Sequence, residues 1–251
     1  VDVKFSGLSW KGNEGIFYSS YEKPKGSELS AKTDQHRLFF HKLGTKQAED
    51  AILFGDQEKR RYVGGYVSDD NRYLFISAAN STSGNELYLK DLSVPNSPIV
   101  AIHKGFEYDV DVLDNIGTTL FIVTNLKAPN KRIVTVDVAN PGVENWKDLI
   151  PETDQVLNPS TGAGYIFANY MKDAVSVVKQ FDYKGKLIRT IALPGVGTAS
   201  GFGGKAKDKE LYFSFTNYVT PGTTYTFFPD SGKSSVYVKP KVDFVSENYE
   251  S

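Results

Sequence analysis

The stretch Gly64-Gly65-Tyr66-Val67-Ser68-Asp69-Asp70-Asn71-Arg72-Tyr73-Leu74-Phe75-Ile76-Ser77 decides the fold. It predicts a short strand, a tight turn and a second strand, because Asp and Asn side chains bond nearby backbone N–H groups and tolerate positive φ. The run from Tyr73 to Ile76 is aromatic or aliphatic without polar alternation, which indicates a strand buried on both faces. In an all-β chain such a sheet must lie between two others, so a recurrence of this unit would predict the whole fold.

A third strand follows each such hairpin, and the unit recurs five times along the chain. The third strands begin 45 to 49 residues apart, and their runs are Leu38–His41, Leu87–Lys90, Ile133–Val136, Val178–Phe181 and Tyr225–Phe228. A period of about 40–50 residues with several short strands per unit is typical of β-propeller blades. We therefore predict an all-β fold with almost no helix, a β-propeller of four-stranded antiparallel blades.

The chain divides into five predicted blades and a short tail. The blades are approximately residues 1–56, 57–104, 105–152, 153–194 and 195–245, and residues 246–251 are a predicted linker. In the fourth blade the first recognisable strand is the run 162–168. Glycines gather in several expected first strands, where inner strands crowd toward a propeller axis and a missing Cβ allows close approach. They are Gly7, Gly64, Gly65, Gly201 and Gly203.

Composition excludes several classes of protein. With 29 basic and 30 acidic residues the net charge is −1, so no global field attracts nucleic acid or an anionic membrane. The absence of Cys excludes disulfides and thiolate metal sites. No apolar run approaches the roughly 20 residues that span a bilayer. We expect a soluble protein of the cytoplasm or the periplasm. The start Val1-Asp2-Val3-Lys4-Phe5 is neither a signal peptide nor an initiator Met, which favours a fragment of a longer chain.

The sequence offers no catalytic constellation, so we expect no catalytic residue, no metal and no cofactor on this chain. A nucleophilic Ser on a strained turn usually sits in Gly-x-Ser-x-Gly between a strand and a helix. That motif is absent, and Ser83-Gly84 and Ser200-Gly201 have no following helix. The three histidines, His36, His41 and His103, do not have metal-ligand spacing.

Three further patterns have simpler interpretations. The acids Glu107, Asp109, Asp111 and Asp114 suggest a calcium loop, but Leu113 occupies a ligand position, so a strand that shows its acids to water or to an axial tunnel is favoured. The glycines at 195, 197 and 201 have the wrong spacing for a dinucleotide loop. Lysines 205, 207 and 209 alternate with acids, which is typical of a solvated turn.

Several motifs, spread over the whole chain in the same order, resemble blades of the prolyl oligopeptidase family of serine peptidases, most closely its bacterial members. They are Lys4-Phe5-Ser6-Gly7-Leu8-Ser9-Trp10 with Gly15-Ile16-Phe17-Tyr18, His41-Lys42-Leu43-Gly44-Thr45, the turn Ser68-Asp69-Asp70-Asn71-Arg72-Tyr73, Asn145-Trp146-Lys147-Asp148-Leu149-Ile150-Pro151-Glu152, and Asn217-Tyr218-Val219-Thr220-Pro221-Gly222.

The resemblance implies a substrate filter. In the family a seven-bladed propeller caps an α/β-hydrolase domain, which cleaves peptides after proline and carries the catalytic Ser, Asp and His. The five units resemble the last five of those seven blades, and residues 247–251 resemble the run toward the hydrolase domain. We therefore expect a chain that gates short peptides, partners the α/β-hydrolase catalytic domain of the same parent protein, and is inactive alone. Five blades at a seven-blade angle would leave an open arc with two unprotected edge sheets.

The same resemblance implies a chamber lining made of Val63, Asn80, Ser81 and Ser83, in a loop whose length differs from that of other members. For Val63, ordinary core packing is an equal alternative. Two other functions stay open: a stand-alone propeller scaffold that binds a protein or peptide partner, and the propeller of a sister oligopeptidase of different specificity. A downstream Gly-x-Ser-x-Gly segment would favour the peptidase over the scaffold.

Overall fold

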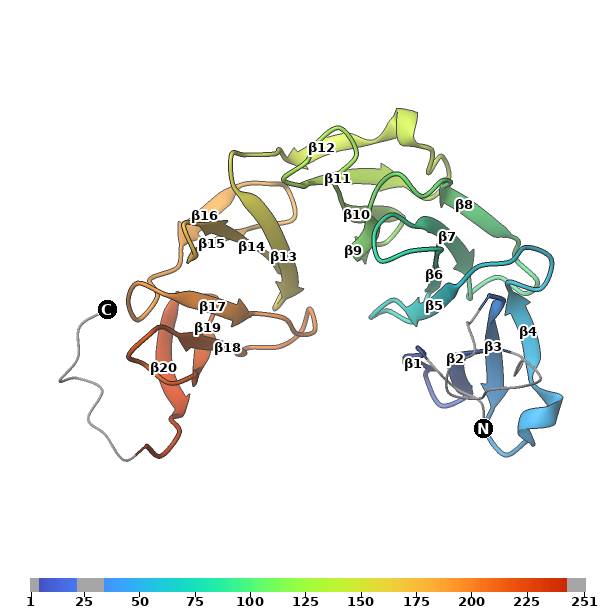
Figure 1. Cartoon of the computed structure of the whole chain (residues 1–251), viewed down its shortest axis with the longest axis horizontal. Helices are drawn as coiled ribbons and strands as arrows, with labels where there is room; N and C mark the ends of the chain where they lie inside the picture. The colour runs from blue at the N-terminus through green and yellow to red at the C-terminus, as the bar shows by residue number, and fades with distance from the viewer. Residues whose placement is uncertain (1–4, 22–33, 243–251) are drawn as a thin grey trace. The chain divides into compact units, whose positions relative to one another are not determined.

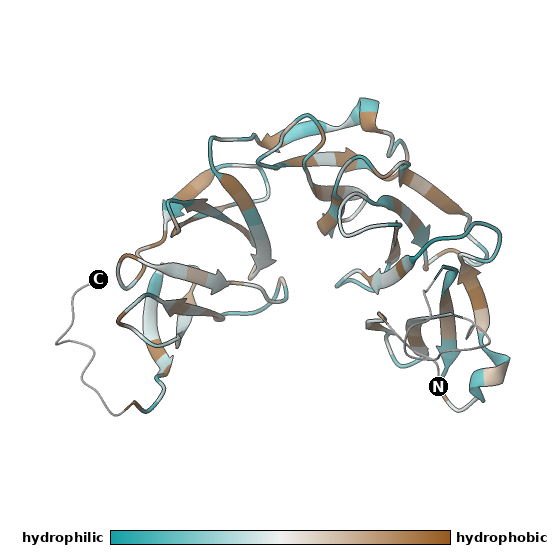
Figure 2. Ribbon diagram, viewed as in Figure 1, coloured by the Kyte–Doolittle hydropathy of each residue, from teal (hydrophilic) through white to brown (hydrophobic). Residues whose placement is uncertain are grey.

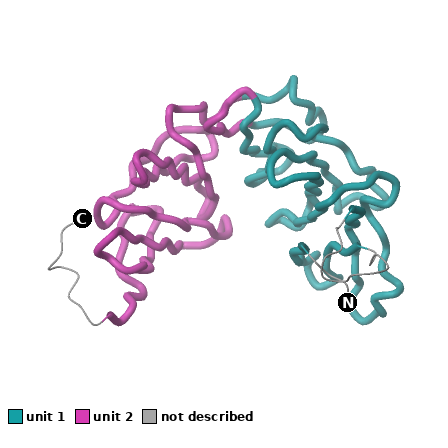
Figure 3. Tube along the Cα trace, viewed as in Figure 1, with its two compact units in different colours: residues 1–126, 135–147 teal, residues 127–134, 148–251 magenta. Residues whose placement is uncertain are grey.

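The computed structural model describes residues 5–21 and 34–242. The predicted linker at 246–251 lies outside the described residues, as does Lys4 of the first family-like motif. The chain forms two compact units, residues 1–126 with 135–147 and residues 127–134 with 148–251 (Figure 3).

The described residues form five four-stranded sheets, and in each sheet the strand order follows the chain (Figure 1). The first contains β1 (Leu8–Lys11), β2 (Gly15–Tyr21), β3 (His36–Lys42) and β4 (Ala51–Phe54). The second contains β5 (Tyr62–Val67), β6 (Tyr73–Ala79), β7 (Glu86–Asp91) and β8 (Ile99–His103). The third contains β9 (Val110–Ile116), β10 (Thr119–Thr124), β11 (Arg132–Asp137) and β12 (Lys147–Ile150). The fourth contains β13 (Val156–Gly162), β14 (Tyr165–Lys172), β15 (Val175–Phe181) and β16 (Leu187–Thr190). The fifth contains β17 (Thr198–Gly201), β18 (Leu211–Thr216), β19 (Thr223–Phe228) and β20 (Lys233–Val238).

These sheets confirm the predicted all-β fold of four-stranded antiparallel blades. Each of the five runs predicted as third strands lies in the third strand of its sheet, namely in β3, β7, β11, β15 and β19. Within the described ranges, helix is limited to two 3-10 turns, η1 (Gln47–Glu49) and η2 (Val143–Asn145).

The start of the fourth sheet differs from the prediction. Its first strand, β13, runs from Val156 to Gly162, and the glycine-rich segment after it is the hairpin turn, where Ala163 and Gly164 have positive φ. The sequence conceals β13 because Pro159 interrupts it and its neighbours are polar. Proline is tolerated there because β13 is an edge strand and needs hydrogen bonds on one side only.

Each unit has its own apolar core, built from residues of adjacent sheets. The hydropathy colours in Figure 2 show hydrophobic residues along the strands of both units. In the first unit, side chains of β2 and β3 pack against the second sheet through Phe17, Leu38, Val63, Leu74, Ile76, Ala78 and Tyr88. In the second unit, the fourth and fifth sheets share Phe167, Val178, Ile191, Ala199, Phe202, Leu211, Phe213, Phe215 and Phe227. Burial of such side chains stabilises the fold by about 1.5–3 kcal/mol each.

A one-residue bulge recurs in the outermost strand of four sheets. The register between the third and fourth strands shifts so that one residue of the fourth strand is left over, and the extra residues are Leu53, Ile102, Ile188 and Tyr237. A bulge adds local twist and bends the strand that carries it. The same irregularity at the same place in each sheet marks these sheets as structural repeats.

Of the two glycines in β5, Gly65 lies at a close approach as predicted and Gly64 does not. A Cβ on Gly65 would lie 2.8 Å from Leu38 Cδ2 in the first sheet, so Gly65 permits tight packing between sheets. A Cβ on Gly64 would have no described atom within 4 Å.

Candidate functional site

The residues predicted to line a chamber lie at one end of the second sheet. Tyr62 pairs with Ala79 and Val63 with Ala78, so the start of β5 and the end of β6 are adjacent. The loop that begins at Asn80 is tied to the same end, because the Arg61 N–H donates to Asn80 Oδ1 at 3.3 Å. The structure therefore brings Val63 and the Asn80–Ser83 loop to the same end of the second sheet.

Their exposure differs. Val63 is 1% exposed and belongs to the core shared by the first and second sheets. Asn80, Ser81 and Ser83 are exposed. The loop residues thus have the accessibility that a lining requires, whereas the Val63 side chain packs in the core. The lining of a chamber by these four residues stays a prediction.

The residues after the loop fix it to the third sheet. Gly84 has a φ of +72°, and a Cβ there would lie 1.8 Å from the Phe106 carbonyl oxygen, so only glycine fits. The Gly84 N–H donates to Asp109 Oδ1 at 2.8 Å. Next to it, the buried Asn85 accepts from the Val110 N–H at 3.0 Å and donates to the Val110 carbonyl at 2.8 Å. Asn85 is not predicted as a functional residue from the sequence, where its only signal is its place as a polar residue directly before an apolar third strand.

The same kind of contact recurs between other neighbouring sheets, and we call it the inter-sheet clamp. In each clamp a buried polar side chain at the start of a third strand bonds the backbone of the next first strand. His36 Nδ1 accepts from the Val63 N–H at 2.9 Å. Ser176 Oγ accepts from the Ala199 N–H at 2.9 Å. Together with Asn85, these side chains satisfy backbone groups that would otherwise be buried without a partner.

An ion cluster lies at the same end of the second sheet. Arg60 Nε lies 2.7 Å from Glu86 Oε2, an Arg60 terminal nitrogen lies 2.6 Å from Glu58 Oε2, and the guanidinium lies 5.3 Å from the centre of the Phe106 ring. The hydrogen bond to Glu86 raises the pKa of Arg60. Burial, with the nearby charge of Glu86, raises the pKa of Tyr88 to about 12. This cluster holds charge in place beside the Asn80 loop, and it too was missed from sequence.

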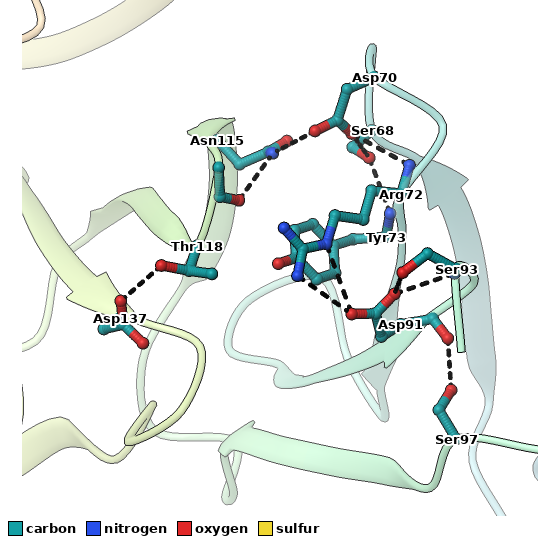
Figure 4. A network of polar contacts seen from close by, with 11 residues as sticks. Ser68, Asp70, Arg72, Tyr73, Asp91, Ser93, Ser97, Asn115, Thr118 and Asp137 are labelled. Atoms are coloured by element: carbon teal, nitrogen blue, oxygen red, sulfur yellow. Dashed lines mark hydrogen bonds and ion pairs between the residues drawn. The ribbon is translucent and has the colours of Figure 1, made fainter.

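The opposite end of the second sheet is closed by the Ser68–Tyr73 turn (Figure 4). Ser68 Oγ donates to Asp70 Oδ1 at 2.6 Å and accepts from the Tyr73 N–H at 2.9 Å, and Asn115 of β9 donates to Asp70 Oδ2 at 2.9 Å. Partial burial opposes ionisation of Asp70, but the hydrogen bonds from Ser68, Asn115 and the Arg72 backbone prevail and lower its pKa. As predicted, the Asp and Asn residues form a tight turn, with Asn71 at a φ of 60°.

The three histidines lie apart in different settings. His36 forms a clamp, and His103 is buried, which lowers its pKa. His41 Nδ1 lies 2.8 Å from Asp50 Oδ1, and the Tyr18 hydroxyl donates to the other oxygen of Asp50 at 2.7 Å. Burial and the bond to Asp50 raise the pKa of Tyr18. These contacts attach the loop before β4 to the first sheet.

The remaining sequence patterns have structural roles. Asp109 holds the Gly84 backbone, and among the described residues no three His, Asp or Glu side chains gather in a way that could hold a metal ion. Ser200 lies within β17, and Asp208 accepts a hydrogen bond from the Lys205 N–H in a turn. No helix in the described ranges is long and apolar enough to cross a membrane.

Five repeated four-stranded antiparallel sheets define a β-propeller protein, and clamps hold the first strands of the second, third and fifth sheets. The family model described as "Prolyl oligopeptidase, N-terminal beta-propeller domain" matches residues 1–240. The chain therefore belongs to the family of prolyl oligopeptidase N-terminal β-propeller domains.

Individual relatives agree with this assignment. The chain is 57% identical to a prolyl endopeptidase of Elizabethkingia miricola over 251 residues, which cover 99% of this chain and 36% of that protein. It is 29% identical to prolyl oligopeptidase A of Galerina marginata, with 96% of this chain and 35% of that protein covered. A solved structure from a study of two prolyl endopeptidases superposes with a TM-score of 0.87 at 27% identity, and the match covers 99% of this chain and 37% of that one. The chain thus spans about a third of the length of these relatives.

Proposed function

We propose that the chain is the substrate-gating propeller of a prolyl oligopeptidase-type serine peptidase that cleaves short peptides after proline. The observation that carries the proposal is the 57% identity to a prolyl endopeptidase along essentially the whole chain. In this proposal the propeller partners the α/β-hydrolase catalytic domain of the same parent protein. That domain supplies the nucleophile, the base and the acid, and the propeller decides which peptides reach them.

The end of the second sheet that holds the Asn80–Ser83 loop is the proposed chamber side. Two features support this. The loop residues are exposed polar groups, able to bond a peptide backbone. The loop is also held at both ends, by Arg61 before it and by Gly84 and Asn85 after it, so it can present those groups in a fixed geometry.

The test compares the full-length protein with the chain alone. We expect the full-length protein to release a chromophore from a blocked reporter peptide after proline, and a serine-directed inhibitor to abolish the release. The chain alone should give no turnover. Inhibitor-sensitive turnover by the chain alone, or a full-length protein that cleaves after basic residues and not after proline, would overturn the proposal.

A further inference from the structure

A cavity of about 300 Å³ is lined by residues of the fourth and fifth sheets, all of them within the second unit. Asn169 of β14 donates through Nδ2 to the Ala199 carbonyl of β17 at 2.8 Å, and this bond holds the two walls together. Ligand pockets in proteins have volumes of about 300–1,000 Å³. The cavity therefore has room for a short segment of a ligand.

The lining of this cavity favours an uncharged ligand. Among the described residues that line it, none is charged. The side chains of Asn158, Ser200 and Ser214 are exposed amide and hydroxyl groups, which can exchange hydrogen bonds with a peptide backbone. Met171 is 43% exposed and adds a flexible apolar surface. A charged side chain placed there would lose hydration without meeting an opposite charge, which is unfavourable.

The loop 217–222 borders the cavity. Thr216, directly before the loop, and Gly222, at its end, both line the cavity. The loop joins β18 to β19, the second and third strands of the fifth sheet, as the Asn80–Ser83 loop joins β6 to β7 in the second sheet. The two loops therefore leave equivalent ends of their own sheets, and in the proposed function that end of the second sheet is the chamber side.

This loop presents Tyr218 to solvent from a backbone that is held in place. Asn217 Oδ1 accepts from the N–H groups of Val219 at 3.1 Å and Thr220 at 2.7 Å. Asn217 Nδ2 donates to the Val196 carbonyl at 3.0 Å, which ties the loop to the segment before β17. Tyr218 itself is 100% exposed. A tyrosine presented in this way offers a large contact area to a ligand at a low cost in conformational entropy.

We propose that the cavity and Tyr218 form a binding subsite for an uncharged stretch of the peptide substrate, beyond the residues on either side of the scissile bond. The Tyr218 ring contacts side chains of the bound stretch, and the amide and hydroxyl groups of the cavity bond its backbone. A docking contact with the catalytic domain would also use an exposed tyrosine, but it would explain neither the cavity beside the loop nor the uncharged lining. The inference rests on the proposed function, which supplies peptides as the ligand, and it adds a selectivity against charged residues.

The test measures kcat/KM of the full-length peptidase for a blocked dipeptide reporter that contains proline and for internally quenched peptides of about ten residues with one proline. In the long peptides a leucine, placed at each distant position in turn, is exchanged for lysine or glutamate. At one or two positions either exchange should lower kcat/KM about tenfold, because both charges lose hydration in the cavity. A loss with both signs of charge separates this effect from a field of one sign.

Variants then assign the selectivity to the subsite. Tyr218→Ala should lower the value for the leucine peptide about threefold to tenfold relative to the reporter, and Tyr218→Phe, which keeps the ring, should restore most of it. The matched control is Tyr237→Ala, 61% exposed on the outermost strand of the same sheet, which should leave the ratio unchanged. Met171→Phe narrows the cavity and should weaken the preference for leucine over lysine. Its control is Leu187→Phe, 47% exposed on the outermost strand of the fourth sheet.

The outcomes separate this inference from the proposed function. Because Tyr218 is fully exposed, Tyr218→Ala should leave the melting temperature unchanged. An equal loss for the reporter and the long peptides in Tyr218→Ala would assign Tyr218 to docking of the catalytic domain and overturn the subsite. Equal cleavage of the leucine, lysine and glutamate peptides at every position would also overturn the subsite and leave the proposed function intact. Failure of the unmodified protein to cleave the reporter and the long peptides after proline would overturn the proposed function itself.

Discussion

The second strand of the second sheet and the second strand of the fifth sheet occupy equivalent places but have different surroundings. In β6, the run Tyr73 to Ile76 is at most 1% exposed, so both faces are covered. In β18, Leu211, Phe213 and Phe215 are buried while Tyr212, Ser214 and Thr216 are exposed. One strand has a neighbour on each face, and the other has an apolar core on one face and an open polar face.

The difference shows that the residue pattern of a strand reports how many of its faces are covered. A strand with one covered face needs apolar residues at every second position only, and polar residues between them cost nothing. A strand with two covered faces must be apolar throughout. The unbroken run in β6 and the alternating run in β18 differ in this way, although both strands have the same place in the same kind of sheet.

Truncation of a large side chain should separate the two strands most clearly. We expect Phe75→Ala in β6 to lower the free energy of unfolding by about 3–5 kcal/mol, because it leaves a cavity in a closed core. Tyr212→Ala in β18, whose side chain is 40% exposed, should cost about 1 kcal/mol or less. Urea denaturation of the two variants measures both values, and equal losses would mean that the two strands are covered alike.

Removal of a clamp should have the next largest effect. Asn85→Ala removes two hydrogen bonds to the backbone of Val110 and leaves the buried N–H and C=O of Val110 without a partner. We therefore expect the free energy of unfolding to fall by about 1–3 kcal/mol. Ser176→Ala, in the clamp next to the fifth sheet, removes a smaller group and should cost about 1 kcal/mol. Ser81→Ala is the control, because Ser81 is exposed in the neighbouring loop. Denaturation midpoints check the order, and a neutral Asn85→Ala would show that water replaces the clamp.

The two glycines of β5 test the packing of the second sheet on the first. Gly65→Ala forces a methyl group against Leu38 and should destabilise the chain by about 1–3 kcal/mol. Gly64→Ala meets open space and should be neutral or stabilising by about 0.4–1 kcal/mol. Thermal melts of both variants measure the difference. An equal loss of stability in both variants would contradict the finding that only Gly65 packs against the first sheet.

Acid should weaken the second sheet before the fifth. Of the four predicted changes in stability, this one should be the smallest. Burial lowers the pKa of His103, which the charges of Glu107 and Glu86 only partly oppose, so the native ring stays neutral where the unfolded ring, with a pKa of about 6.5, takes up a proton. Below that pH the unfolded state binds more protons, and stability falls by at most about 1.4 kcal/mol per pH unit. Hydrogen exchange at pH 7 and pH 5 should show lost protection in β8 and little change in β18. His103→Phe should remove the difference, and its persistence in that variant would assign it to another group.

The features that were predictable from sequence are those that depend on residues close together along the chain. The third strands, the Ser68–Tyr73 turn and the covered faces of β6 all follow from short patterns. The strand β13 was hidden because Pro159 is compatible with an edge strand, and sequence alone does not show which strands are edges. The surroundings of the candidate site depend on contacts between sheets. Asn85 bonds Val110, 25 residues away, and Arg60 pairs with Glu86, 26 residues away, and neither spacing has a pattern that local periodicity could reveal.

The recurring bulge in the outermost strands has a consequence for the behaviour of the chain in concentrated solution. A fourth strand has an unpaired outer edge, and a long flat edge is a template for adding a strand of another molecule. This kind of association is most favoured at β20, because Val236, Tyr237 and Val238 are all more than half exposed. The bulge at Tyr237 interrupts the regular spacing of hydrogen-bonding groups along that edge. The four bulges at Leu53, Ile102, Ile188 and Tyr237 therefore act as built-in protection against edge-to-edge aggregation.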